Sequence, residues 1–202
     1  VLSGLGTQEQ QIQAMNSVKE YLDTDLGIKK IHPAMTTDYP TKEENLTCYN
    51  KGCGENGSVF CHANTWAIIA ECMLGRPENA WKYYHQLLPM IAQKTAGAER
   101  YKAEPYVYSS NIFGPESDKF GLANVSWLTG TAAWMYLAAT QYLLGVRPTW
   151  DGLEIDPCLP EQLLPAKVTR VFRGCRYEIT ITKNQKLSLP HVEGRKQLTV
   201  TV

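Results

Sequence analysis

A glycine-rich turn leads into an apolar helix in the stretch Gly52-Cys-Gly-Glu-Asn-Gly-Ser-Val-Phe-Cys-His-Ala-Asn-Thr-Trp66. Because glycine adopts backbone conformations that are closed to other residues, the three glycines predict a tight loop that presents Glu55 and Asn56. His62 then stands at the start of the expected helix. An acid and a histidine brought to one point are typical of a site for a polar ligand. The same pattern also fits a buried turn followed by a histidine that only packs in the core.

Helical periodicity extends on both sides of this turn. Residues 7–26 predict an amphipathic helix that begins with a capping box of Thr7 and Gln10. Residues 60–74 predict a second helix, and a proline at a first helical position starts a third over residues 77–91. The short connection between the second and third helices predicts a helical hairpin.

A long connection over residues 101–124 interleaves aromatic, hydroxyl and amide groups in Glu104-Pro-Tyr-Val-Tyr-Ser-Ser-Asn111. Such a mixture suits a sugar ring, although tyrosines that only pack the loop explain it equally well. Thr129 is the predicted N-cap of the last helix, which runs to Leu144. The free N–H groups at this helix start could bind phosphate, although capping without a ligand is the commoner use of such residues.

The hydrophobic period changes after Pro148 from helical to alternating. Four segments alternate as strands do and are separated by glycine, proline and asparagine turns, namely residues 152–156, 168–172, 176–182 and 197–202. The predicted fold is therefore mainly α with an appended β part. We expect a helical domain over residues 1–147 and a small antiparallel β domain over residues 148–202.

Composition excludes several classes of function. Lysine plus arginine and aspartate plus glutamate both number 20, so no basic field attracts nucleic acid or an anionic membrane. Six cysteines without a C-x-x-C pair are typical of free thiols in a reducing compartment.

The apolar runs are too short to span a membrane, and the first residues lack the order of a signal peptide, so we expect a cytoplasmic protein. A start at Val1 instead of methionine suggests a piece of a longer polypeptide.

Four motifs follow one another along the chain. They are Glu55-Asn-Gly-Ser-Val-Phe-Cys-His62, Glu104-Pro-Tyr-Val107, Asn124-Val-Ser-Trp-Leu-Thr-Gly-Thr-Ala-Ala-Trp134 and Gly145-Val-Arg-Pro-Thr-Trp-Asp-Gly-Leu-Glu-Ile-Asp-Pro-Cys158. Together they resemble the C-terminal part of the cellobiose phosphorylase family, whose members are inverting glycoside phosphorylases acting on β-linked disaccharides and short oligosaccharides. The resemblance implies that residues 1–147 are part of a six-hairpin α/α barrel, which agrees with the helical-then-strand order.

The resemblance also implies roles for individual residues. His62 matches the histidine that binds the attacking phosphate. Thr129 and Gly130 match the hydroxyl and the backbone N–H that complete the phosphate site. Glu55 matches the acid that hydrogen-bonds the sugar on the acceptor side.

Two departures from the family pattern concern this acceptor side. Ser110, which we place with Glu55 among the sugar-binding residues, stands where many cellobiose-specific members have glutamine. Gly54 stands where they have lysine. A cellodextrin, laminaribiose or another β-glucoside is therefore as plausible a substrate as cellobiose.

The implied reaction needs one carboxylic acid to protonate the leaving oxygen, while phosphate takes the place of the activated water of a hydrolase. Its products are an α-sugar 1-phosphate and a shorter sugar. In the family this acid is an aspartate upstream of the segment seen here, and the contexts of Asp23, Asp25 and Asp38 do not match it. We expect the chain to carry the phosphate and acceptor side without its general acid, and to be inactive alone. The implied partners are the sugar, inorganic phosphate, the missing N-terminal part and, as is often found in the family, a second copy in a homodimer, with no cofactor and no metal.

Two other interpretations of the chain stay open. The first is a non-catalytic or decayed carbohydrate-binding protein of the same fold. The second is a metal site of Cys53, Cys61 and His62. The metal site is the weaker of the two, because Cys61 and His62 are adjacent and project in different directions from a helix.

Overall fold

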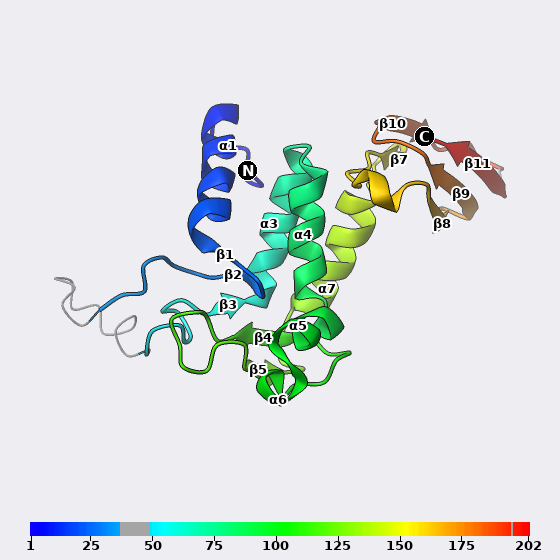
Figure 1. The fold of residues 1–202 in the computed structure, drawn as a ribbon. Coiled ribbons are helices and arrows are strands. Elements are labelled where there is room, and N and C mark those ends of the chain that lie inside the picture. Colours follow the sequence, from blue (N-terminus) through cyan, green and yellow to red (C-terminus); the bar gives the residue numbers. More distant parts are fainter. Residues whose placement is uncertain (37–48, 195) are drawn as a thin grey trace.

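The computed structural model describes residues 1–36, 49–194 and 196–202, and a helical part is followed by a β part (Figure 1). In the described residues six α-helices form the helical part: α1 (Gln8–Ser17), α3 (Cys61–Met73), α4 (Pro77–Leu87), α5 (Pro89–Ala96), α6 (Ala98–Tyr101) and α7 (Thr131–Leu137). The π-helical segment η1 (Val18–Leu22) continues α1, and η2 (Ala138–Leu143) continues α7. Helices α1, α4 and α7 all contact α3, which therefore lies at the centre of this part.

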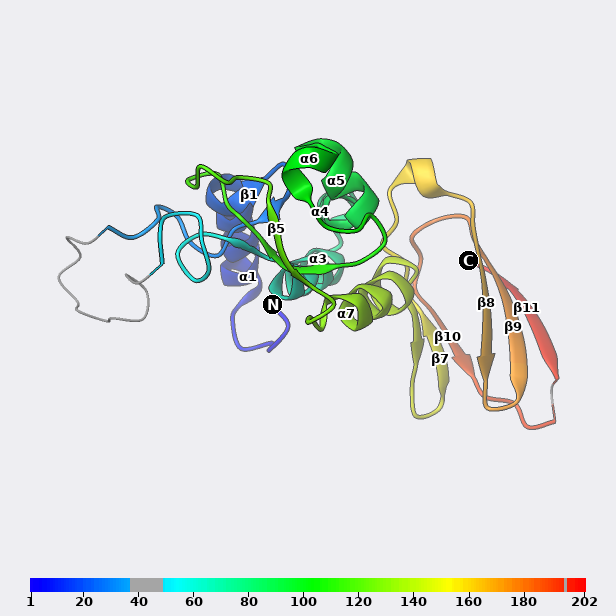
Figure 2. The same ribbon diagram turned by 90° about the horizontal axis from the view of Figure 1, so that it is seen from below.

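Short strands form four small sheets in the described residues, and the last two sheets make up the β part (Figure 2). The first sheet pairs β1 (Asp23–Thr24) with β2 (Gly27–Ile28), and the second has the strand order β3 (Val59–Phe60), β4 (Ser109–Ile112) and β5 (Ala123–Ser126). The third sheet has the strand order β10 (Leu187–Pro190), β7 (Gly152–Ile155) and β6 (Val146–Pro148). The fourth has the order β11 (Gln197–Thr201), β9 (Cys175–Ile181) and β8 (Ala166–Phe172). A short 3₁₀ turn, η3 (Glu161–Leu163), precedes β8. The sheet of β3, β4 and β5 lies where α3 and α7 begin, and the β part lies beyond their other ends (Figure 1).

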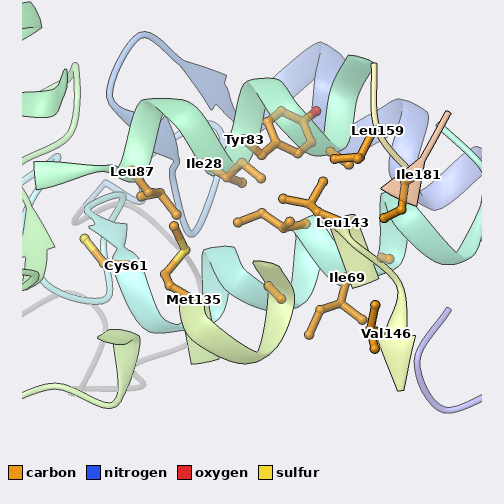
Figure 3. Close-up of a cluster of buried hydrophobic side chains, with 14 of the residues drawn as sticks. Ile28, Cys61, Ile69, Tyr83, Leu87, Met135, Leu143, Val146, Leu159 and Ile181 are labelled. Carbon is orange, nitrogen blue, oxygen red and sulfur yellow. The ribbon is translucent and has the colours of Figure 1, made fainter. Parts of the chain in front are cut away.

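One cluster of buried apolar side chains joins the helical part to the β part (Figure 3). Ile69 of α3, Met135 of α7 and Leu143 of η2 are buried in it, together with Ile181 of β9. Burying a side chain of this size stabilises the fold by about 1.5–3 kcal/mol. The shared core fixes α3 and α7 side by side. His62 lies in the first turn of α3, and Gly130 is the N-cap of α7.

The first helix begins as predicted but ends earlier. Thr7 and Gln10 form the reciprocal capping box, which confirms the predicted start. The prediction that the helix continues to residue 26 is wrong, because η1 ends at Leu22 and a β1–β2 hairpin follows. The Thr24 hydroxyl donates to the Gly27 carbonyl oxygen at 2.6 Å, and Gly27 has a φ of 126°. A local side-chain hydrogen bond and a glycine conformation therefore replace the last helical turn.

The predicted helical hairpin is confirmed. Helix α3 agrees with the predicted 60–74 within one residue at each end, and it packs against α4. The third predicted helix is wrong in one respect, because it breaks into α4 and α5 at Leu88. Leu88 has a ψ of 126°, since the residue before a proline is driven out of the helical region by the ring of Pro89.

The connection over residues 101–124 contains regular structure that the sequence did not reveal. It contains β4 and the start of β5. Strand β4 pairs with β5 along one edge and with β3 along its other edge. In this antiparallel ladder Phe60 is opposite Asn111, and Asn111 is opposite Asn124. Residues opposite one another share a face of the sheet, so these three side chains lie on one face.

The alternating segments of the β part are strands as predicted, with β6 and β10 in addition. The expectation that the sheets are purely antiparallel is wrong for one pair, because β11 runs parallel to β9. The chain leaves β9, pairs with β7 as β10, and then returns beside β9 in the original direction. This excursion into the neighbouring sheet turns the last pairing into a parallel one.

Two further expectations concern cysteines and membranes. The five described cysteines, at positions 53, 61, 72, 158 and 175, are free thiols, as predicted. Cys48 and Asp38 lie outside the described residues. Among the helices that the structure describes, none has the length and apolar character needed to span a bilayer.

Candidate functional site

The glycine-rich turn adopts the conformation that its composition predicts. Gly52, Gly54 and Gly57 have φ angles of 75°, 47° and 104°. These values lie in the left-handed region, where residues with a β-carbon are strained. The Gly52 N–H donates to the carbonyl oxygen of Asn56 at 2.8 Å, which closes the loop on itself.

Asn56 holds this loop to its neighbours. Its side-chain oxygen accepts the Met35 N–H at 2.6 Å, and its amide nitrogen donates to the Tyr49 carbonyl oxygen at 3.0 Å. Asn56 is buried, so its hydrogen-bonding groups serve the loop. The preceding carboxylate is presented outward, because the Glu55 side chain is 55% exposed.

Glu55 has a cationic partner from a distant part of the chain. The Lys30 ammonium lies 2.7 Å from the Glu55 Oε1 atom. The Lys30 side chain is only 20% exposed. The carboxylate that the resemblance places on the acceptor side is thus half of an ion pair.

His62 lies in the first turn of α3 among aromatic rings. Its ring centroid is 5.2 Å from that of Trp66 and 6.0 Å from those of Phe60 and Trp134. The His62 Nε2 atom is buried and has no hydrogen-bond partner in the described residues. Because a buried polar atom without a partner costs about 1–3 kcal/mol, this nitrogen points to a water molecule or a ligand.

The start of α7 lies directly against this histidine. A β-carbon built on Gly130 would be 3.0 Å from Cε1, 3.3 Å from Nδ1 and 3.4 Å from Nε2 of His62. Contacts this short exclude a larger residue at Gly130 unless the imidazole moves. The structure therefore brings together His62 and the helix start that the sequence analysis assigned to one phosphate site.

Thr129 is close to its predicted place, although it is not the N-cap. Gly130 is the N-cap residue, and the helix begins at Thr131. The Thr129 hydroxyl oxygen accepts the Thr131 N–H at 3.2 Å and lies 2.6 Å from the Thr131 hydroxyl. The Thr131 N–H, which is one of the N–H groups expected to be free at this helix start, is therefore occupied. In the described residues the Gly130 N–H has no acceptor and is available to a ligand.

The sheet register places Ser110 relative to its neighbours. Ser110 lies on β4 between Ser109 and Asn111, and successive strand side chains point to opposite faces. Ser110 is thus on the face away from Phe60, whereas Asn111 and its cross-strand partner are on the Phe60 face. Asn111 belongs to the stretch whose composition suits a sugar ring, whereas Asn124 was not expected from the sequence to take part in sugar binding. Asn111 and Asn124 each lie in or beside a quoted motif, but only strand pairing shows that they are neighbours.

Asp23 and Glu104, two carboxylates among the described residues, both have partners that favour the ionised form. Asp23 forms an ion pair with Lys82. Glu104 accepts the indole N–H of Trp127 at 3.2 Å. A hydrogen bond from its own backbone N–H and that from the indole hold the pKa of Glu104 below its usual value. Glu104 is therefore ionised at neutral pH and suited to accept hydrogen bonds.

The geometry gives no support to a metal site. Cys61 is buried with its sulfur 3.7 Å from the Ser109 hydroxyl, whereas His62 faces Gly130. The part of the chain that the structure describes contains no group of three or more His, Cys, Asp or Glu side chains arranged to hold a metal ion.

Comparison with known protein families divides the chain into two matches. Residues 1–145 match the family described as glycosyl hydrolase 94 superfamily, catalytic domain. Residues 146–202 match the family described as glycosyl hydrolase family 65, C-terminal domain.

Individual relatives are similar along almost the whole chain. An N,N'-diacetylchitobiose phosphorylase of Vibrio proteolyticus is 39% identical over 201 residues, which is 99% of this chain and 24% of the relative. A solabiose phosphorylase of Paenibacillus borealis is 35% identical over 99% of this chain and 25% of the relative. A cyclic β-(1,2)-glucan synthase of Rhizobium meliloti is 32% identical over 98% of this chain and 7% of the relative. The chain thus spans about a quarter of the length of the two phosphorylases.

Proposed function

The chain belongs to the glycosyl hydrolase 94 superfamily, whose catalytic domain matches residues 1–145, and on this premise we propose that it is the phosphate- and acceptor-binding part of an inverting glycoside phosphorylase. The complete enzyme cleaves a β-linked disaccharide or short oligosaccharide with inorganic phosphate. Its products are an α-sugar 1-phosphate and a sugar one unit shorter.

The pairing of His62 with Gly130 is the observation that carries this proposal. Within the described residues, a buried imidazole nitrogen without a partner and a backbone N–H without an acceptor lie close together. An imidazole N–H and a backbone N–H at a helix start can both donate hydrogen bonds to an anion, and together they suit phosphate. The Thr129 hydroxyl, which is held beside them by Thr131, adds a third group.

The reaction follows from what such a pocket can do. Phosphate that is oriented in line with the anomeric carbon attacks from the face opposite the leaving sugar, so the configuration inverts. The pocket takes over the work of the second carboxylate of an inverting hydrolase, because phosphate is already an anionic nucleophile. His62 and Gly130 bind and orient it.

The acceptor side of the substrate is assigned to Glu55 and the adjoining sheet. Glu55 accepts hydrogen bonds from the hydroxyl groups of the departing sugar. Ser110 stays a predicted sugar-binding residue on the strength of the family resemblance. Asn111 and Asn124 offer further amide groups on the face of the sheet that carries Phe60. Cellobiose, a cellodextrin, laminaribiose and N,N'-diacetylchitobiose are the first substrates to test, the last because of the Vibrio proteolyticus relative.

We assign the general acid and the rest of the barrel to a missing N-terminal part. The helices around α3 are the last portion of a six-hairpin α/α barrel, and residues 148–202 are its C-terminal β domain. Side chains on the helices support an absent neighbour, because Trp66 is 42% exposed, Met73 51% and Tyr136 66%. A cytoplasmic homodimer of the complete enzyme is the expected form.

The test is phosphate-dependent cleavage by the full-length gene product. Each candidate disaccharide is incubated with and without inorganic phosphate, and sugar 1-phosphate is measured. We expect sugar 1-phosphate and free sugar in equal amounts, and only with phosphate. Sugar binding without any cleavage would instead support a non-catalytic carbohydrate-binding protein.

A further inference from the structure

Lys29 and Lys30, which directly follow β2, form ion pairs with different parts of the chain. The Lys29 side chain is 8% exposed, and its ammonium lies 2.5 Å from Glu116 Oε1, which ties this segment to the loop between β4 and β5. The next side chain, Lys30, pairs with Glu55 at 2.7 Å. Lys29 therefore serves the fold, while Lys30 is directed to the glycine-rich turn.

The Lys30 ammonium is held in place from several directions. The backbone N–H of Lys30 donates to the Ser58 carbonyl oxygen at 3.0 Å, which fixes the backbone from which the side chain extends. Its Nζ atom lies 4.5 Å from the centroid of the Phe60 ring. A cation over an aromatic face is stabilised by the ring quadrupole, more strongly where water is partly excluded. Lys30 thus has a defined position before any sugar binds.

Phe60 connects this ion pair to the proposed phosphate site. The Phe60 ring centroid lies 4.5 Å from the Lys30 ammonium and 6.0 Å from the centroid of the His62 ring. A pocket of about 240 Å³ has Lys30, Phe60 and Ala63 in its lining. Pairwise contacts therefore link Glu55 to Lys30, Lys30 to Phe60 and Phe60 to His62.

The ion pair leaves part of the Glu55 carboxylate available. Lys30 contacts Oε1, while the Glu55 side chain remains 55% exposed. A carboxylate with one oxygen fixed by a cation presents the other in a single direction, and charge-assisted hydrogen bonds to it are strong. A loop glutamate on a glycine-rich turn would otherwise lose several rotamers on binding a sugar.

We propose that Lys30 is a positioning residue that orients the Glu55 carboxylate toward the acceptor sugar. This inference rests on the proposed phosphorylase function and concerns its acceptor side only. Lys30 acts through Glu55, so its removal weakens acceptor binding and leaves the phosphate side intact.

The test measures synthesis from sugar 1-phosphate and acceptor by the full-length gene product, with the sugar pair on which the unchanged protein is active. For Lys30→Met we expect the KM for the acceptor to rise about tenfold and the KM for sugar 1-phosphate to change less than twofold. Lys30→Arg should retain most of the acceptor affinity. Lys186→Met is the matched control, because Lys186 is an exposed lysine paired with Glu154 at 2.7 Å in the β part.

A double-variant comparison separates positioning from direct contact with the sugar. If Lys30 acts through Glu55, the protein with both Lys30→Met and Glu55→Gln has the same acceptor KM as Glu55→Gln alone. Additive losses, or a Lys30→Met protein that matches the Lys186→Met control, would overturn the inference while leaving the phosphorylase intact. An unchanged protein without activity on any β-linked disaccharide would overturn the proposed function and this inference with it.

Discussion

The imidazole of His62 packs against the α-carbon side of Gly130, so closely that an added β-carbon would be 3.0 Å from its Cε1 atom. The two residues come from the first turn of α3 and the N-cap of α7, which are 68 positions apart in the chain. The shared core holds these two helices side by side. The proposed anion site therefore depends on this core as well as on His62 and Gly130 themselves.

Removing the His62 side chain should weaken phosphate use selectively. In the full-length gene product we expect His62→Ala to raise the KM for phosphate about tenfold or more, because a hydrogen bond to a charged group contributes about 1.5–3 kcal/mol. The affinity for the disaccharide should change little. His85→Ala is the control, since this histidine lies on α4 with its ring 5.5 Å from that of Trp81. Equal losses for phosphate and sugar would show that His62 only packs.

Adding a methyl group at Gly130 should disturb the same site without unfolding the protein. Gly130 has a φ of −79°, which alanine adopts readily, so the backbone gives no reason for strain. The new β-carbon would press on the His62 ring, and we expect a higher KM for phosphate in Gly130→Ala. Thermal unfolding measured in parallel should shift by only a few degrees. An unchanged phosphate KM would contradict the close packing of these two residues.

The buried carboxyl of Glu71 should make stability depend on pH. Burial raises the pKa of Glu71, and the Arg76 guanidinium 3.7 Å away opposes this only in part. A raised folded-state pKa favours the protonated folded protein, so this contribution is present below the ordinary carboxyl pKa of 4.5 and is lost as the pH rises through the folded-state pKa. At pH 7 we expect Glu71→Gln to raise the melting temperature by about 2–4 °C, which corresponds to about 1 kcal/mol.

The comparison with an exposed glutamate makes this measurement specific. Melting temperatures of Glu71→Gln and Glu193→Gln are recorded between pH 4.5 and pH 8. The gain from Glu71→Gln should shrink toward the acidic end, while Glu193→Gln stays close to the unchanged protein throughout. A Glu71→Gln protein that is destabilised at pH 7 would mean that the charged carboxylate, paired with Arg76, stabilises the fold.

The isolated chain should not catalyse phosphorolysis. Protonation of the leaving group by a positioned acid contributes roughly 10²–10⁴ in rate, and we assign that acid to the missing part. The exposed Trp66, Met73 and Tyr136 should also drive self-association, which sedimentation of the 202-residue chain would show. A stable monomer that turns over a β-linked disaccharide at ordinary enzyme rates would contradict this and would point to Asp38 or Glu104 as the acid.

Local sequence signals predicted the elements whose causes are local. The capping box at Thr7, the glycine-rich turn and helix α3 are all present, because each depends on residues close together in the chain. The membership of the family, inferred from four motifs, is confirmed by the match over residues 1–145. The predicted end of the first helix was wrong, because the helix gives way to a hairpin that is held by the side-chain hydrogen bond from Thr24 to Gly27.

Features set by distant contacts were not predictable. The sheet that pairs Phe60 with Asn111 joins segments about 50 residues apart, and the parallel pairing of β11 with β9 depends on the excursion of β10. The Lys30–Glu55 ion pair likewise joins the segment after β2 to the glycine-rich turn. His62 and Gly130 could be named from motifs, but only the packing of α3 on α7 shows that they touch.

Nuclear magnetic resonance of the products tests the central claim most directly. The full-length gene product is incubated with a β-linked disaccharide and inorganic phosphate, and the ³¹P and anomeric ¹H signals are followed, with His62→Ala alongside. The account predicts that α-sugar 1-phosphate appears in step with the loss of phosphate, and far more slowly in the variant. Release of free sugars at the same rate with and without phosphate, or a β-sugar 1-phosphate as product, would contradict it.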